Sequence, residues 1–156
     1  MDNSEKKLRI YLENSVICGY FDVEFRVATT KLFDMFRQGI FIPVISDHTM
    51  FELDAGAQPK IYDNLNTLQF QLYKTNDEMN ILKEKYLQKK IVTPKYGADA
   101  LHIAIATIIQ VDILVSWNFK HIVNFDKIKL FNAVNVKEGY KPIMILTPME
   151  VIKNEE

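Results

Sequence analysis

The sequence contains little that points to a secreted or membrane-bound protein. A single cysteine, Cys18, excludes an intrachain disulfide framework and a thiolate zinc cluster, and it fits a reducing cytoplasm. The apolar run over residues 100–109 is shorter than the roughly 20 residues that cross a bilayer. No hydrophobic signal segment follows the polar residues 1–7. We therefore expect a cytoplasmic protein with no membrane segment.

The chain also lacks an excess of charge of either sign. Its 19 basic and 20 acidic residues give a formal net charge of −1, so there is no global attraction to a polyanion. A nucleic-acid partner would have to be held by a local basic patch or by a metal ion. Only five glycines occur, and none forms a glycine-rich phosphate loop, which argues against a phosphatase- or nucleotide-binding α/β domain.

What is present is an ordinary globular composition. Apolar residues make up 48% of the chain and charged residues 25%, which argues against intrinsic disorder. A length of 156 residues suits one domain with a real core. We predict a single domain over residues 1–156, with residues 1–7 as a polar N-terminal extension.

Short β-prone runs alternate with helical patterns along the chain. Strands are predicted over residues 8–12, 40–45, 112–116 and 143–146. Pro43 weakens the second strand or places it at a sheet edge. The block 59–90 is predicted to be a helical hairpin, whose second helix opens with a capping box between Thr75 and Glu78. The other helices are predicted after Asp22, after a Ser46 cap, and over 97–106, 125–136 and 148 onwards.

Strands separated by helices imply a parallel sheet that is covered on both faces. In such sheets, ligands bind beyond the carboxyl ends of the strands. Glu13 directly follows the first predicted strand, and Asn118 closely follows the third. We therefore expect these two polar side chains at the functional edge of the sheet.

The most informative stretch is residues 97–106, where Asp99 and His102 begin an otherwise apolar helix. With Glu13, with Glu52 on a preceding helix and with Asn118, it predicts a pocket for a divalent metal ion. Simpler interpretations exist, since Asp99 could only complement the helix dipole and Glu52 could be a solvated helix residue. His102 is better explained as a packed or hydrogen-bonded histidine than as a metal ligand.

Four blocks of the sequence together resemble the PIN domain family, and more narrowly its VapC-like toxin branch. They are residues 10–15, residues 45–46 with Glu52, residues 96–104 and residues 114–119. The resemblance implies a three-layer α/β/α domain with a mostly parallel central sheet. It also implies a metal-dependent endoribonuclease that cleaves RNA phosphodiester bonds with Mg²⁺ or Mn²⁺.

The resemblance assigns the catalytic positions to Glu13, Glu52, Asp99 and Asn118, of which Glu13 and Asp99 would bind the metal. Ser15, Ser116 and His102 would support them. This chain carries Glu13 and Asn118 where the family usually has aspartate. The extra methylene of Glu13 moves the carboxylate by roughly 1.5 Å, and positioning errors near 1 Å can cost on the order of 100-fold in rate. Asn118 removes one charge.

The resemblance further implies an RNA substrate, a cognate antitoxin protein and a homodimer. The departures at Glu13 and Asn118 leave an alternative open. In that alternative the chain is a catalytically attenuated PIN domain that binds RNA or a protein without cutting.

Overall fold

A computed structural model describes residues 6–153, so most of the predicted N-terminal extension lies outside the described residues. The described chain contains five strands: β1 (Arg9–Leu12), β2 (Ile42–Ser46), β3 (Gln71–Tyr73), β4 (Ile113–Val115) and β5 (Met144–Leu146). They form one sheet in the order β3-β2-β1-β4-β5, and every pairing is parallel. The predicted parallel sheet is confirmed.

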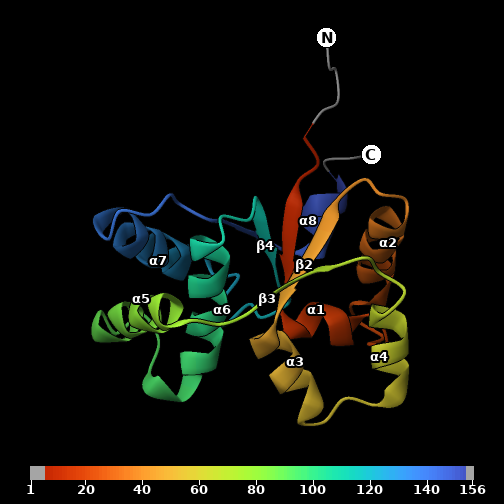
Figure 1. Cartoon of the computed structure of the whole chain (residues 1–156), viewed down its shortest axis with the longest axis horizontal. Helices are drawn as coiled ribbons and strands as arrows, with labels where there is room; N and C mark the ends of the chain where they lie inside the picture. Colours follow the sequence, from red (N-terminus) through yellow and green to blue (C-terminus); the bar gives the residue numbers. More distant parts are fainter. Residues whose placement is uncertain (1–5, 154–156) are drawn as a thin grey trace.

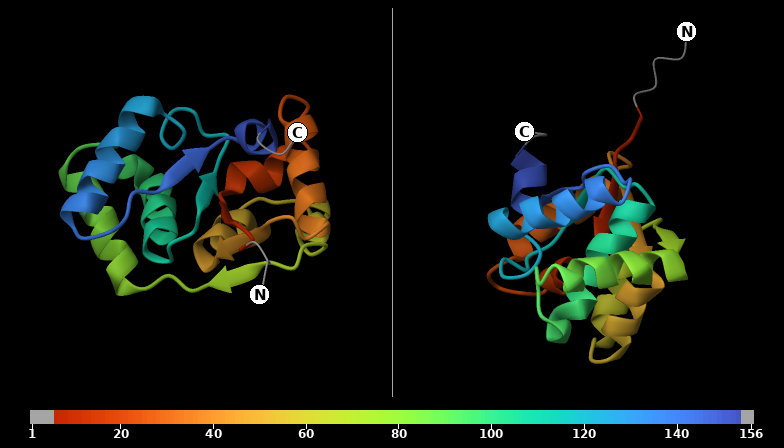
Figure 2. Two further views of the ribbon diagram at one scale, coloured as in Figure 1. Left: turned by 90° about the horizontal axis from the view of Figure 1, so that it is seen from above. Right: turned by 90° about the vertical axis from the view of Figure 1, so that its left-hand side faces the viewer.

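Helices cover both faces of this sheet, as Figures 1 and 2 show. One side carries α5 (Asp77–Gln88), α6 (Gly97–Ile108) and α7 (Phe125–Lys137). The other side carries α1 (Asn14–Gly19), α2 (Arg26–Arg37), α4 (Pro59–Leu65) and α8 (Pro148–Lys153), and α3 (Asp47–Asp54) follows β2 directly. The architecture is the expected three-layer α/β/α sandwich.

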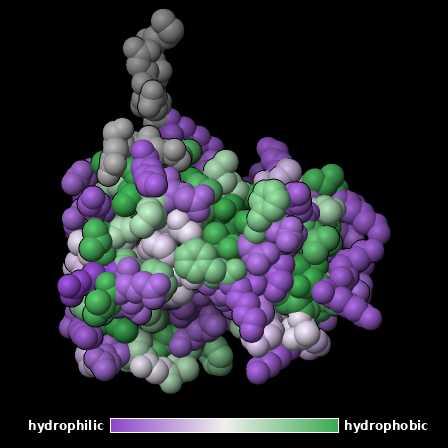
Figure 3. Space-filling view, turned by 180° about the vertical axis from the view of Figure 1, so that it is seen from behind, coloured by the Kyte–Doolittle hydropathy of each residue, from purple (hydrophilic) through white to green (hydrophobic). Residues whose placement is uncertain are grey.

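The surface mixes apolar and polar side chains, and no large single-kind region dominates the face shown in Figure 3. In residues 6–153, no helix is long and apolar enough to span a membrane.

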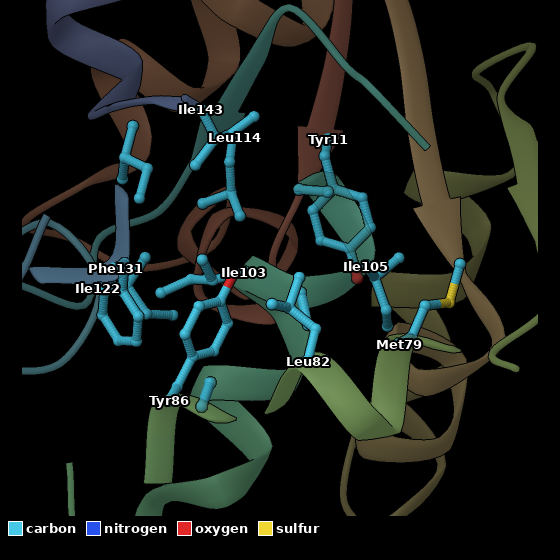
Figure 4. Close-up of a cluster of buried hydrophobic side chains, with 14 of the residues drawn as sticks. Tyr11, Met79, Leu82, Tyr86, Ile103, Ile105, Leu114, Ile122, Phe131 and Ile143 are labelled. Atoms are coloured by element: carbon cyan, nitrogen blue, oxygen red, sulfur yellow. The ribbon is translucent and has the colours of Figure 1, made fainter. Parts of the chain in front are cut away.

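Successive side chains of the central strand enter opposite cores, because strand residues alternate between the two faces of a sheet. Ile10 and Leu12 belong to the cluster beneath α1, α2 and α8, whereas Tyr11 belongs to the cluster beneath α5 and α6. Figure 4 shows the Tyr11 ring among the side chains of this second cluster. All three residues are fully buried, which explains why β1 is an uninterrupted apolar run.

The prediction of a weak or edge strand at Pro43 is wrong, because β2 lies inside the sheet between β1 and β3. Ile42 donates its backbone N–H to Leu8 of the β1 side at 2.9 Å. Consecutive residues of a strand alternate between the two neighbours, so Pro43 faces the β3 side. Pairing with β3 begins only at Val44, and the missing N–H of Pro43 therefore interrupts no ladder.

The block 59–90 is not a helical hairpin, because the three-residue strand β3 lies between α4 and α5. The predicted capping box is also absent. The N-cap of α5 is Asn76, which accepts a hydrogen bond from Met79 N at 3.0 Å. Thr75 instead donates its backbone N–H to Asp47 at 2.9 Å, and so ties the chain after β3 to the start of α3.

Two further differences concern the region after β1. A six-residue helix, α1, begins directly after Glu13, where only the end of a strand was predicted. The next helix, α2, begins at Arg26, so Val23 lies before it and is 82% exposed. Val27 is exposed as well, and the buried face of α2 includes Leu32, Phe33 and Phe36.

Candidate active site

The candidate site lies at the carboxyl edge of the sheet, beyond the neighbouring strands β1 and β4. Glu13 directly follows β1 and donates its backbone N–H to Val115 at the end of β4, at 3.3 Å. Ser116 and Asn118 follow β4. The parallel pairing of β1 with β4 therefore brings residues about a hundred positions apart in the chain to one place.

Glu13 is buried and its carboxylate is held by two serines. Its Oε2 accepts hydrogen bonds from the Ser15 backbone N at 3.1 Å, from the Ser15 hydroxyl, and from the Ser116 hydroxyl at 2.8 Å. Within residues 6–153 the other oxygen, Oε1, has no hydrogen-bond partner. The hydrogen bonds of this carboxylate are thus concentrated on one of its two oxygens.

Ser15 and Ser116 also organise the chain after β4. Ser15 Oγ accepts the backbone N–H of Trp117 at 2.8 Å, and Ser116 Oγ accepts that of Asn118 at 2.9 Å. The two serines therefore join Glu13 to the segment that carries Asn118. This explains why small hydroxyl side chains suit both positions, since each oxygen accepts one bond and donates another.

The Asn118 carbonyl oxygen is already used inside the protein. Its Oδ1 accepts the backbone N–H groups of Lys120 and His121 at 3.2 and 3.0 Å. The amide nitrogen of Asn118 is therefore the part of this side chain that is turned to other partners. Its interaction with Asp99 partly offsets the burial that raises the pKa of that carboxyl group.

Asp99 lies in the first turn of α6, as predicted, and is partly buried. Burial raises the pKa of this carboxyl group, and the negative charge of Glu52 raises it further. His102, His121 and Asn118 act in the opposite direction. Asp99 is thus an acid whose negative charge is poorly compensated within the described chain.

Glu52 is held by the histidine that follows Asp99 by one helical turn. The Nε2 atom of His102 contacts Glu52 Oε1, and the Nδ1 atom of His102 lies 2.7 Å from the Tyr11 hydroxyl. Tyr11 in turn contacts Ser46 Oγ at 2.8 Å. A buried polar chain therefore runs from β1 through α6 to the carboxylate of α3.

Burial sets the protonation states of His102 and Glu52 in this row of hydrogen-bonded side chains. His102 is fully buried, and burial lowers its pKa, so the neutral imidazole is favoured. With Nε2–H donated to the Glu52 carboxylate, Nδ1 accepts the proton of the Tyr11 hydroxyl. Burial raises the pKa of the Glu52 carboxyl group, because it disfavours the charged form there too. His102 is thus a buried histidine that is hydrogen-bonded to Glu52.

His48 completes this cluster. It precedes Glu52 by one turn of α3, and its Nε2 lies 3.7 Å from Glu52 Oε1 and 3.1 Å from the Ala98 carbonyl oxygen. Its ring centroid is 4.4 Å from that of His102. The four-residue spacing of His48 and Glu52 was the available signal, because residues i and i+4 share one face of a helix.

The predicted residues thus fall into two linked groups. Glu13, Ser15, Ser116 and Asn118 form one hydrogen-bonded group at β1 and β4. Glu52 and His102 form the other, between α3 and α6. Asp99 interacts electrostatically with members of both groups. Tyr11, Ser46 and His48 were not predicted as site residues.

Comparison with known proteins supports this architecture. One similar solved structure is a chain of the crystal structure of VapBC2 from Rickettsia felis bound to a DNA fragment from their promoter. It aligns with a TM-score of 0.53 and 16% sequence identity, over 88% of this chain and 98% of that one. No protein-family model and no curated protein matches the sequence. The expected PIN-like fold is confirmed, and at this identity the likeness concerns the fold alone.

Proposed function

We propose that the protein is a metal-dependent endoribonuclease of the VapC-like kind, which cleaves RNA phosphodiester bonds. The observation that carries the proposal is the placement of Glu13, Glu52, Asp99 and Asn118. They come from four different elements or the loops that follow them, at the edge of a parallel sheet where α/β proteins bind ligands. The PIN-like fold of the chain agrees with this function.

The residues fit a Mg²⁺ or Mn²⁺ ion. Hard cations take oxygen ligands, and Glu13 offers a free carboxylate oxygen whose partner oxygen is fixed by serines. Asp99 is partly buried and burial raises the pKa of its carboxyl group, so a cation beside it would stabilise its negative charge. Next to Glu13, the buried Oδ1 of Asn14 has no hydrogen-bond donor within residues 6–153. Surplus acceptors of this kind favour a cation or its bound water.

Glu13 and Asp99 would hold the metal, and Glu52 would orient a water molecule. When bound, a metal ion lowers the pKa of a water molecule that it holds and offsets negative charge around the phosphorus atom. Because its carbonyl oxygen is engaged, Asn118 would act as a hydrogen-bond donor toward Asp99 or a phosphate oxygen. The hydrogen bonds from Tyr11 to His102 and from His102 to Glu52 would keep Glu52 in one orientation.

The same proposal includes a cognate antitoxin, a homodimer and a cytoplasmic location. The similar chain belongs to a VapBC2 structure, which supports an antitoxin partner. An apolar groove next to the site offers a surface for a protein partner. It runs between α2 and α8, and its lining includes Phe25, Val27, Trp117, Phe119 and Met149.

The test is RNA cleavage by the purified full chain in the presence of Mn²⁺ or Mg²⁺. We expect cleavage that chelation with EDTA abolishes, and we expect Asp99→Asn to remove it. Loss of a metal ligand should cost more than the roughly 10- to 100-fold lost with an outer-shell partner. Cleavage that survives Asp99→Asn would disprove the proposed site.

The alternative is an attenuated PIN domain that binds RNA or a protein without cutting. It is favoured by the engaged oxygen of Asn118 and by the longer side chain at Glu13. The double variant Glu13→Asp/Asn118→Asp separates the two functions. If the variant cuts RNA at millimolar Mn²⁺ and the natural chain does not, the natural chain is a binding module.

A further inference from the structure

We propose that His48, Glu52 and His102 form a binding site for a divalent transition-metal ion of the Zn²⁺ type, between α3 and α6. This site is chemically distinct from the oxygen-rich set of Glu13 and Asp99. The ion-binding inference stands without the proposed nuclease function. Its regulatory consequence, given below, rests on that function.

The geometry brings three ligand atoms together. His48 and Glu52 lie on one face of α3 at a spacing of four residues, and His102 faces them from α6. One ring nitrogen of each histidine and a carboxylate oxygen of Glu52 lie within 4.8 Å of one another. Ligands of a tetrahedral Zn²⁺ at about 2.0–2.2 Å are spaced roughly 3.5 Å apart. The 3.7 Å between His48 Nε2 and Glu52 Oε1 is close to that spacing. The direct hydrogen bond between His102 Nε2 and Glu52 Oε1 would open to admit the ion.

The ligand types select the metal. Two imidazole nitrogens and one carboxylate oxygen form a His₂Glu set, which binds Zn²⁺ and leaves a position for water. Mg²⁺ prefers oxygen ligands and keeps several waters, so it favours the carboxylate pocket instead. Neutral histidines are required for metal binding, and burial lowers the pKa of both His48 and His102 toward that state.

The surroundings also suit a metal site. Metal-bound histidines usually donate their other ring N–H to an oxygen, and Tyr11 lies 2.7 Å from His102 Nδ1. With metal on Nε2, His102 would donate Nδ1–H to Tyr11, and the Tyr11 hydroxyl would donate to Ser46. His48 would give up its Nε2–H bond to the Ala98 carbonyl. The exposed fractions of the His48 and Glu52 side chains, 12% and 29%, leave the site open to solvent on the α3 side.

Occupation of this site has a consequence if the nuclease proposal holds. Glu52 would then be shared between the zinc site and the carboxylate pocket. Zn²⁺ bound to the two histidines would draw Glu52 away from the pocket and inhibit Mg²⁺-dependent cleavage of RNA.

The first test measures Zn²⁺ affinity of the full chain without RNA, by competition with a chromophoric chelator. We expect one Zn²⁺ per chain. His48→Ala should weaken binding by about tenfold or more, since it removes a direct ligand. Asp99→Asn removes a nearby charge but none of the three proposed ligands, so it should change the affinity much less than His48→Ala does. His121→Gln, at the third histidine of the chain, is the matched histidine control and should leave the affinity unchanged.

A second measurement identifies the ligands. Co²⁺ in place of Zn²⁺ should give the visible absorption bands of a four-coordinate ion in the natural chain, and His48→Ala should remove them. Equal affinity in His48→Ala and the natural chain, no Zn²⁺ binding, or a loss caused by Asp99→Asn rather than His48→Ala would each overturn the proposal. Both measurements follow metal binding without RNA, so they test the zinc site even if the protein does not cleave RNA.

Discussion

The hydroxyl of Tyr11 lies 2.7 Å from Nδ1 of His102, and both side chains are completely buried. This contact joins the central strand to α6 and directs the opposite ring nitrogen of His102 toward Glu52. A carboxylate at the edge of the sheet is thereby oriented from inside the hydrophobic core. The stability of the core and the geometry of the site are coupled through these two residues.

Tyr11→Phe should lower both the stability of the protein and the rate of RNA cleavage. The substitution leaves Nδ1 of His102 without its donor, and an unsatisfied buried acceptor costs about 1–3 kcal/mol. Looser orientation of Glu52 should lower the rate of RNA cleavage by roughly 10- to 100-fold. Urea unfolding and cleavage kinetics measure the two effects.

Tyr86→Phe is the matched control for Tyr11→Phe. Tyr86 is a fully buried tyrosine of the same core cluster, and its hydroxyl bonds to Asn135 away from the site. We expect a comparable loss of stability with no loss of cleavage. Equal cleavage by Tyr11→Phe and the natural chain would show that His102 does not position Glu52.

Asp99→Asn should make the protein more stable at neutral pH. The pKa of Asp99 is raised in the folded state, so charging it costs stability once the pH exceeds the unfolded value of about 3.9. Below that value both states are protonated and the cost is absent. The urea midpoint of Asp99→Asn should therefore exceed that of the natural chain at pH 7, and the gap should shrink as the pH falls toward 4.

Asp126→Asn is the control for a simple helix-dipole effect. Asp126 is an exposed acid in the first turn of α7, and its loss should reduce stability by about 0.3–1 kcal/mol. If Asp99→Asn destabilises the protein in the same way, Asp99 only complements its helix and is not held under electrostatic strain.

Ser15 and Ser116 should act as a coupled pair. Both hydroxyls donate to Oε2 of Glu13, so either serine partly satisfies the carboxylate when the other is lost. Residues in one hydrogen-bond network typically show coupling energies of about 0.5–3 kcal/mol. A double-mutant cycle of Ser15→Ala and Ser116→Ala, read by urea unfolding, measures this energy. Additive single effects would mean that the two serines act independently.

Gly19→Ala should disturb the segment after β4. A β-carbon at Gly19 would lie 3.0 Å from the Trp117 ring and 3.3 Å from Thr29 Oγ1, which accepts the indole N–H. Overpacking of this kind costs about 1–3 kcal/mol. Trp117 is the only tryptophan in the chain, so its fluorescence reports the displacement directly. Gly56→Ala, where a β-carbon meets no atom within 4 Å, should leave the emission unchanged.

Local patterns were sufficient for most of the fold. The apolar strands, the Ser46 cap and the helix that begins near Asp99 were predicted because their signals lie within a few neighbouring residues. The strand β3 was missed because three residues carry too little periodicity, and two of them are exposed. Thr75 was misassigned because its hydrogen-bond partner, Asp47, lies 28 positions away.

The local patterns along the chain are enough to predict the alternation of strands and helices, and with it the edge of the sheet to which Glu13 and Asn118 belong. The atoms that each polar side chain contacts depend instead on how the folded core places the elements. Ser116 meets Glu13 across 103 positions, and Tyr11 meets His102 across 91, through strand pairing and helix packing. The reason is physical: an element forms from its own residues, whereas a hydrogen bond between elements depends on where the whole core places them.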